Sequence, residues 1–83
     1  MEFEPHVAKE LRDLQRGDLQ QVMDRIRRLG DDPRPPGCEK LVGMANAWRI
    51  RSGNYRVVYT VDDRAQVVTI TRVGHRREVY RRR

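Results

Sequence analysis

The N-terminal third of the chain places apolar residues three or four positions apart, which is the spacing of one face of an α-helix. Two such stripes are present: Val7, Leu11 and Leu14 form the first, and Leu19, Val22, Ile26 and Leu29 form the second. We expect Pro5 to lie in the first turn of one helix and a left-handed Gly17 to end it. Asp18 then caps a second helix, which Gly30 ends. Because almost nothing separates the two segments, the pattern predicts an antiparallel helix hairpin that needs a sheet to lie on.

After a proline-rich segment at residues 31–37, the apolar period changes from helical to two, which is typical of β-strands. Alternation and β-branched content predict three strands and two very short ones: residues 47–52, 55–61 and 66–73, with 39–42 and 1–4. Gly53-Asn54 suits a two-residue hairpin loop because both residues tolerate positive φ, and residues 62–65 form the next turn. The order of the elements predicts a single α+β domain spanning residues 1–83.

The Gly53-Asn54 loop determines which residues of its two strands lie opposite each other. The expected pairs are Ser52–Tyr55, Arg51–Arg56, Ile50–Val57 and Trp48–Tyr59, and in the next hairpin Val57–Ile70 and Tyr59–Val68. One face of the sheet then carries the core residues Trp48, Ile50, Val57, Tyr59, Val68 and Ile70. The other face carries Arg49, Arg51 and Arg56 with Thr60, Thr69 and Thr71.

Facing arginines are unfavourable for folding alone, because like charges directly opposite destabilise a strand pair by up to about 1 kcal/mol. Proteins accept such local conflicts chiefly at functional sites, so we interpret this face as an anion-binding site. The alternative is a solvated sheet face whose long side chains splay apart. Strict alternation would turn Arg72 toward the core, so a bulge or the end of the strand must intervene, and Gly74 suits such a break.

Charge is distributed unevenly along the chain, whose net charge is +6. Residues 1–47 carry eight basic and nine acidic side chains, whereas residues 48–83 carry ten arginines and three acidic side chains. Arginine favours phosphate because its planar guanidinium donates two parallel hydrogen bonds. The C-terminal excess therefore predicts a polyanion or an acidic protein as partner.

Other classes of protein are disfavoured by the sequence. No apolar run approaches the ~20 residues of a membrane span, so no membrane contact is expected. The single cysteine, Cys38, cannot form an internal disulfide, which favours a cytoplasmic location. Cys38 and the two histidines fall short of a four-ligand zinc site, and no glycine-rich phosphate loop is present. Neither a metal nor a nucleotide cofactor is therefore expected.

Three blocks of sequence resemble those of a known toxin family: Lys40-Leu41-x-Gly43, then Trp48-Arg49-Ile50-Arg51-x-Gly53-x-Tyr55-Arg56-Val57-Val58-Tyr59, then Val73-Gly74-His75-Arg76-Arg77-Glu78-Val79-Tyr80. With the helical half, they make nearly the whole chain similar to the RelE branch of the RelE/ParE superfamily. The resemblance implies a microbial RNase-type α+β fold, with two helices packed on a curved, mainly antiparallel sheet of three to four strands. It also implies a type II toxin–antitoxin toxin that cuts mRNA in the A site of the 30S ribosomal subunit, inhibits translation and is held inactive by a RelB-like antitoxin.

By the same resemblance, the family's catalytic and RNA-binding positions fall on Arg49, Arg51, Arg56, Arg76 and Tyr80, and the rim adds Arg72 and Arg77 as RNA-binding residues. Metal-independent cleavage uses the 2′-hydroxyl as nucleophile and needs a base, positive charge for the phosphorane and an acid. Our hypothesis gives Tyr80 the base role, since neighbouring arginines favour its anion. Arg56 then stabilises the phosphate, and Arg76 stands on the leaving-group side.

His75 is the rival acid–base residue, because imidazole titrates near pH ~6.5. Its alternative role is that of a rim residue that orients the turn at Gly74. Two other functions remain open: a ParE-like inhibitor of DNA gyrase without enzymatic activity, and a plain RNA or ribosome binder. In each case an antitoxin is expected to cover the basic face or displace the C-terminal segment, by a helix in a groove or by an added strand.

Overall fold

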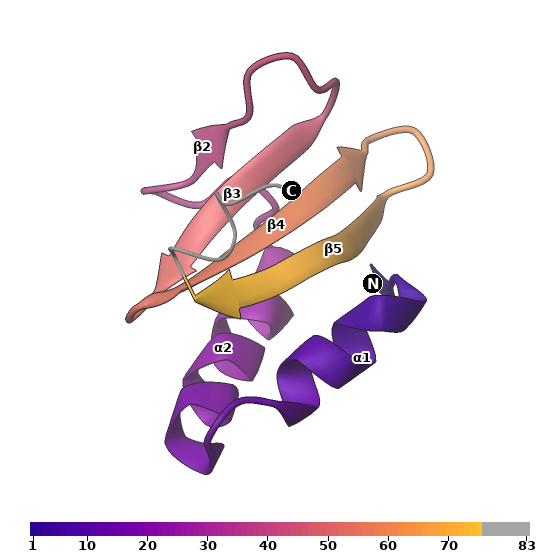
Figure 1. The fold of residues 1–83 in the computed structure, drawn as a ribbon. Helices are drawn as coiled ribbons and strands as arrows, with labels where there is room; N and C mark the ends of the chain where they lie inside the picture. Colours follow the sequence, from indigo (N-terminus) through magenta and orange to yellow (C-terminus); the bar gives the residue numbers. More distant parts are fainter. Residues whose placement is uncertain (76–83) are drawn as a thin grey trace.

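The computed structural model describes residues 1–75 of the chain. Its elements follow the order β1 (Glu2–Phe3), α1 (Pro5–Arg12), α2 (Arg16–Leu29), β2 (Glu39–Lys40), β3 (Ala47–Ser52), β4 (Tyr55–Asp62) and β5 (Val67–His75). The strands form one sheet in the spatial order β1-β5-β4-β3-β2, with both helices on one face (Figure 1). β1 pairs with β5 in parallel, and the other neighbours are antiparallel. The predicted α+β class is confirmed, but the sheet has five strands rather than three to four because both two-residue segments join it.

The break between the helices comes earlier than the sequence pattern predicted. α1 ends at Arg12 and α2 begins at Arg16, so the predicted caps Gly17 and Asp18 are wrong: both residues lie in the first turn of α2. Asp18 is favourable there, because a carboxylate near a helix N-terminus interacts well with the helix dipole. Gly30 ends α2 as predicted. Figure 1 shows the helices diverging from their connection, so that α1 packs on β5 and α2 on β3 and β4. Neither helix has the length and apolar character needed to cross a lipid bilayer, and residues 1–75 contain no other helix.

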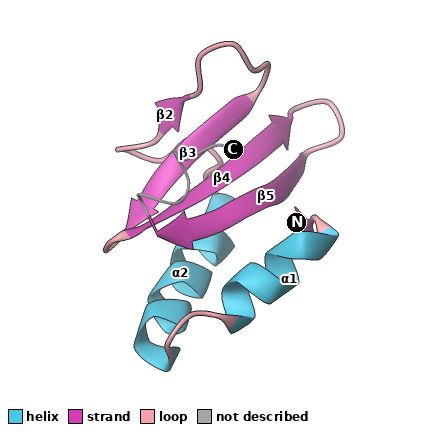
Figure 2. Cartoon of the chain, viewed as in Figure 1, coloured by secondary structure: helices cyan, strands magenta, loops and turns pink. Residues whose placement is uncertain are grey.

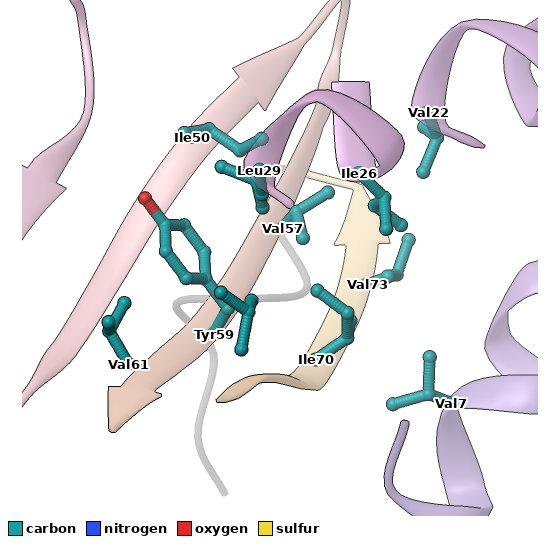
Figure 3. Packing of buried hydrophobic residues seen from close by; sticks show 11 residues of the cluster. Val7, Val22, Ile26, Leu29, Ile50, Val57, Tyr59, Val61, Ile70 and Val73 are labelled. Carbon is teal, nitrogen blue, oxygen red and sulfur yellow. The ribbon is translucent and has the colours of Figure 1, made fainter. Parts of the chain in front are cut away.

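The hydrophobic core fills the space between the helices and the sheet (Figure 3). The helices contribute Val7, Val22, Ile26 and Leu29, and the strands contribute Ile50, Val57, Tyr59, Val61, Val68, Ile70 and Val73. Leu11, Leu14 and Trp48 are partly buried and pack against this cluster. The predicted inward stripes are therefore confirmed except at Leu19, which is half-buried and not part of this cluster, and the burial of their apolar surface holds the helices on the sheet.

The β3–β4 hairpin has the register that the sequence predicted. Ser52 pairs with Tyr55 across the loop, and Arg51 lies opposite Arg56. Of the two loop residues, Gly53 has a positive φ of 60°. A two-residue loop with positive φ at its first position matches the right-handed twist of the strands. This local match brings the two arginines face to face.

The predicted register of the β4–β5 hairpin is wrong by two residues. Ile70 lies opposite Tyr59 rather than Val57, because the four-residue turn occupies residues 63–66, one position later than the predicted 62–65. The carboxylate of Asp62 accepts hydrogen bonds from two backbone N–H groups of this loop, both at 3.1 Å, and so stabilises the turn at this position. Because side chains alternate with a period of two, this shift leaves Val68 and Ile70 on the predicted core face.

A β-bulge in β5 turns Arg72 outward. This confirms the prediction that a break in the strand keeps Arg72 away from the core. The pairing with β4 shifts between Val58 and Tyr59, which leaves Thr71 as the extra residue. The hydroxyl of Thr71 donates a hydrogen bond to the Val58 carbonyl oxygen at 3.1 Å. The break does not lie at Gly74, because the strand continues through it. The bulge is the local cause of the outward position of Arg72.

The proline-rich segment between α2 and β2 is anchored to the sheet at several points. The Tyr59 hydroxyl donates a hydrogen bond to the Pro33 carbonyl oxygen at 2.7 Å. The guanidinium of Arg34 donates to both carboxylate oxygens of Asp63, at 3.1 and 2.8 Å, and lies 5.1 Å from the centre of the Trp48 ring. These contacts hold the connector against β3 and β4 and determine where β2 joins the sheet.

Removal of the Tyr59 hydroxyl tests this anchor. Burial raises the pKa of Tyr59 well above that of free tyrosine, so the hydroxyl stays protonated and donates. We expect Tyr59→Phe to lower the free energy of unfolding by about 1 kcal/mol, because the Pro33 carbonyl loses its donor while the ring keeps its packing. Denaturant unfolding measures the difference. Tyr55→Phe, at a half-buried ring, is the matched control, and an equal loss in both variants would contradict the anchor.

Side chains of α1 cover the edge of β5 beyond its pairing with β1. His6 Nε2 lies 2.6 Å from the Thr71 carbonyl oxygen, and the Val73 N–H donates to the Glu10 carboxylate at 2.6 Å. The two side chains lie one helical turn apart and satisfy backbone groups that an edge strand otherwise presents to other chains. This part of the sheet edge is therefore closed to strand addition while α1 stays in place.

Candidate functional site

Four arginines project from the side of the sheet opposite the helices: Arg49 and Arg51 of β3, Arg56 of β4 and Arg72 of β5. We name this surface the arginine face. Ile50, Val57 and Val73, which are next to these residues in the chain, are buried in the core, so strand alternation directs the arginines outward. Figure 2 shows both helices on the other side of the sheet, and within residues 1–75 no helix covers the arginine face.

The strand register arranges the four arginines in two adjacent rows. Arg51 and Arg56 lie directly opposite each other in one row, which Gly74 continues on β5. In the next row, Arg49 and Arg72 flank Val58 from both sides. With neighbouring strands about 4.8 Å apart and rows about 7 Å apart, the Cβ positions span a patch of roughly 10 by 7 Å. Four positive charges therefore converge on a small area of the sheet.

Arg56 is the most deeply buried member of the arginine face. It is 8% exposed, whereas Arg51 and Arg72 are exposed and Arg49 is partly buried. Its neighbour on β5, Gly74, adds no side chain on that side. Water screens a buried charge less than an exposed one, so the field of the guanidinium is stronger there. The charge of Arg56 is therefore less screened by water than the charges of the exposed Arg51 and Arg72.

Glu39 of β2 borders the arginine face, and the sequence reasoning did not select it. It lies opposite Arg49 in the ladder, and Arg49 Nε donates to its carboxylate at 3.0 Å. This hydrogen bond and the charge of Arg49 lower the pKa of Glu39, and the charges of Arg51 and Arg56 add to the shift. No signal in the sequence could have placed Glu39, because a two-residue strand has no alternation that sets its register.

His75 lies on the helix side of the sheet rather than on the arginine face. Its ring meets that of Tyr55 edge-on, with the ring centroids 5.8 Å apart and the planes at 76°. Both residues line a pocket of about 340 Å³ with Glu10 and Asp13 at the C-terminal end of α1. Arg56 lies opposite Gly74, so alternation along β5 turns the next residue, His75, to the other face of the sheet.

The remaining candidate residues, Arg76, Arg77 and Tyr80, lie outside the described residues, and their roles stay predictions. Within residues 1–75, no three His, Cys, Asp or Glu side chains are grouped so that they could hold a metal ion. What the described residues offer chemically is a set of guanidinium donors for an anion, with one carboxylate, that of Glu39, at its border.

Comparison with known proteins places this arrangement in a family. The family model described as "ParE toxin of type II toxin-antitoxin system, parDE" matches residues 1–80. The chain belongs to the RelE/ParE toxin superfamily. This RelE-type toxin is 30% identical over 86 residues to the protein named RelE1 of Methanocaldococcus jannaschii, which covers 98% of this chain and 93% of that protein. It is 44% identical over 39 residues to Toxin RelG of Mycobacterium tuberculosis, a match that covers 47% of this chain and 45% of that protein.

Solved structures agree with this assignment. The isolated E. coli RelE toxin is 34% identical to this RelE-type toxin, with a TM-score of 0.78 over 95% of this chain and 87% of that chain. A chain of the intact E. coli RelBE toxin–antitoxin complex is 33% identical, with a TM-score of 0.78 over 89% of this chain and 92% of that chain. The recognised resemblance and the predicted fold of a RelE-type toxin are confirmed, and the chain is a type II toxin.

Proposed function

We propose that this RelE-type toxin is a ribosome-dependent endoribonuclease that cleaves mRNA in the A site and thereby inhibits translation. The observation that carries the proposal is the arginine face, where Arg51 and Arg56 are paired in spite of their mutual repulsion. A bound phosphodiester relieves that repulsion, because it accepts hydrogen bonds from both guanidinium groups. The similarity to the E. coli RelE toxin supports the same assignment.

The proposed reaction is an internal transesterification. The 2′-oxygen attacks the adjacent phosphorus while its proton passes to a base, and the 5′-oxygen leaves with a proton from an acid. The products are a 2′,3′-cyclic phosphate and a 5′-hydroxyl. Negative charge builds on the phosphorane oxygens in the transition state, and fixed guanidinium donors stabilise that charge.

The residue roles follow from placement and from the family resemblance. Arg56, central and buried, stabilises the reacting phosphate, and the other arginines of its face hold flanking phosphates with Arg77. Tyr80 acts as the base and Arg76 assists the leaving group. The contact of His75 with Tyr55 on the helix side favours a positioning role for His75 over direct contact with the phosphate.

We also infer a RelB-like antitoxin as the cognate partner, since the similar E. coli RelE chain forms a toxin–antitoxin complex. An acidic or amphipathic segment that covers the arginine face would neutralise its charge and block access of RNA. A ribosomal target implies action in the cytoplasm. The chemistry proposed here uses no metal or cofactor.

The second candidate is a ParE-like inhibitor of DNA gyrase, because the matching family model carries the ParE description. Such an inhibitor acts by binding a protein and has no need of a catalytic arginine cluster.

Translation in a purified extract separates the two functions. We expect the toxin to stop protein synthesis and to produce new mRNA ends inside codons at the A site, while isolated RNA is cut poorly because the ribosome aligns the reacting phosphate. Primer extension maps these ends, and addition of the antitoxin is the control that should abolish them. Inhibition of supercoiling without mRNA cleavage would instead assign the gyrase function.

A further inference from the structure

Glu39 places a carboxylate among cations that the proposed function needs for RNA. It is 58% exposed at its side chain, whereas that of its partner Arg49 is 18% exposed. Arg49 contacts the same carboxylate oxygen through Nε and Nη2, so the guanidinium is aligned along its edge with Glu39. The carboxylate therefore occupies a hydrogen-bonding edge of Arg49 that a phosphate would also use.

The position of the Glu39–Arg49 ion pair is set by the backbone, through the pairing of β2 with β3 and the contacts of the connector before β2. β2 consists of two residues, and its register sets Glu39 directly opposite Arg49. The connector before β2 is held by the hydrogen bond from Tyr59 to Pro33 and by the paired contacts of Arg34. The anchored connector before β2 therefore holds Glu39 at the border of the arginine face.

The carboxylate also interacts with the arginines beyond its direct partner. Arg49 accounts for most of the lowered pKa of Glu39, and Arg51 and Arg56 contribute through their charge. By reciprocity, the negative charge of Glu39 weakens the attraction that these cations exert on an incoming anion. The carboxylate side of this ion pair is open to water, which weakens the pair, so a well-aligned phosphate can replace the carboxylate at Arg49.

We propose that Glu39 is an internal counterion of the arginine face, which competes with RNA phosphate for Arg49 and so limits the affinity of the toxin for RNA that the ribosome has not aligned. This inference rests on the proposed function, since it assumes that RNA binds this face. Glu39 thereby sets a threshold: weakly placed phosphates do not displace it, and a correctly aligned strand does.

Binding of a labelled single-stranded RNA, followed by fluorescence anisotropy over a series of salt concentrations, tests the proposal without ribosomes. We expect Glu39→Gln to bind about two- to fivefold more tightly than the wild type. The slope of log affinity against log salt should steepen by about 0.7, because one more phosphate is neutralised. Asp31→Asn is the matched control: it removes the same charge beyond the C-terminus of α2, and we expect no comparable gain.

A double-mutant cycle then asks whether Glu39 acts through Arg49. In an Arg49→Gln background, the Glu39→Gln substitution should no longer tighten binding. An unchanged affinity in the single variant, an equal gain in Asp31→Asn, or a gain that persists without Arg49 would each overturn the counterion role. Loss of mRNA cleavage in Glu39→Gln with unchanged RNA binding would also overturn it, since it would assign Glu39 to the chemical step.

The two proposals fail in distinguishable ways. If the wild type cuts no mRNA on ribosomes but the Glu39→Gln and Asp31→Asn variants differ as expected, the nuclease function falls and the counterion stands. If cleavage occurs and the two variants bind alike, only the counterion falls. If cleavage occurs on ribosomes but neither the wild type nor the Glu39→Gln variant binds free RNA, only the counterion falls. If cleavage and RNA binding are both absent, both proposals are wrong.

Discussion

Replacement of Arg56 by glutamine is expected to lower ribosome-dependent mRNA cleavage by about 100- to 1000-fold, the usual effect of removing one fixed donor from a site that stabilises transition-state charge. The reason is its position: Arg56 is central on the arginine face, 8% exposed, and opposite Arg51. Single-turnover cleavage on programmed ribosomes measures the chemical step apart from binding.

Two further variants make the Arg56 result specific. Arg64→Gln removes the same charge from the exposed loop between β4 and β5 and should leave cleavage nearly unchanged. Arg56→Lys keeps the charge but lacks the planar fork, so it should recover part of the lost rate. Thermal unfolding of each variant shows that the fold persists. Full cleavage by a folded Arg56→Gln protein would remove Arg56 from the proposed mechanism.

Tyr80→Phe is expected to lower the cleavage rate by about 100- to 10,000-fold while ribosome binding stays close to that of the wild type. Loss of a general base has an effect of this size, and the substitution keeps the aromatic ring. Comparison of single-turnover rates with the ribosome affinity separates chemistry from binding. Tyr55→Phe, which alters a tyrosine on the helix side, is the control and should cleave normally.

His75→Ala decides between the two acid–base hypotheses. The ring of His75 contacts Tyr55 and lines the pocket beside α1, so we expect its removal to have a much smaller effect than Tyr80→Phe. The opposite order of effects would assign the acid–base role to His75 and leave Tyr80 as a binding residue.

Local sequence signals predicted the parts of the fold that depend on neighbouring residues. Gly53 and Asn54 predicted the β3–β4 loop, and from it followed the opposition of Arg51 and Arg56. The caps at Gly17 and Asp18 were placed wrongly, because a glycine and an acid also suit the first turn of a helix. The β4–β5 register was wrong because Asp62, expected in the turn, ends β4 and stabilises a turn that begins one residue later. The assignment of side chains to the two faces was not affected, because the register was shifted by two residues and side chains alternate with a period of two.

The sequence by itself determined that two amphipathic helices cover one face of a mainly antiparallel sheet and that arginines from adjacent strands share the other face. It could do so because strand alternation and a two-residue loop are short-range properties. Only the tertiary structure decided that the bulge required to turn Arg72 outward lies at Thr71, that His75 points to the helix side, and that Glu39 meets Arg49. These outcomes depend on contacts between segments far apart in the chain, such as the anchored connector before β2 and the two-residue edge strand β2 itself. No local sequence pattern encodes such contacts.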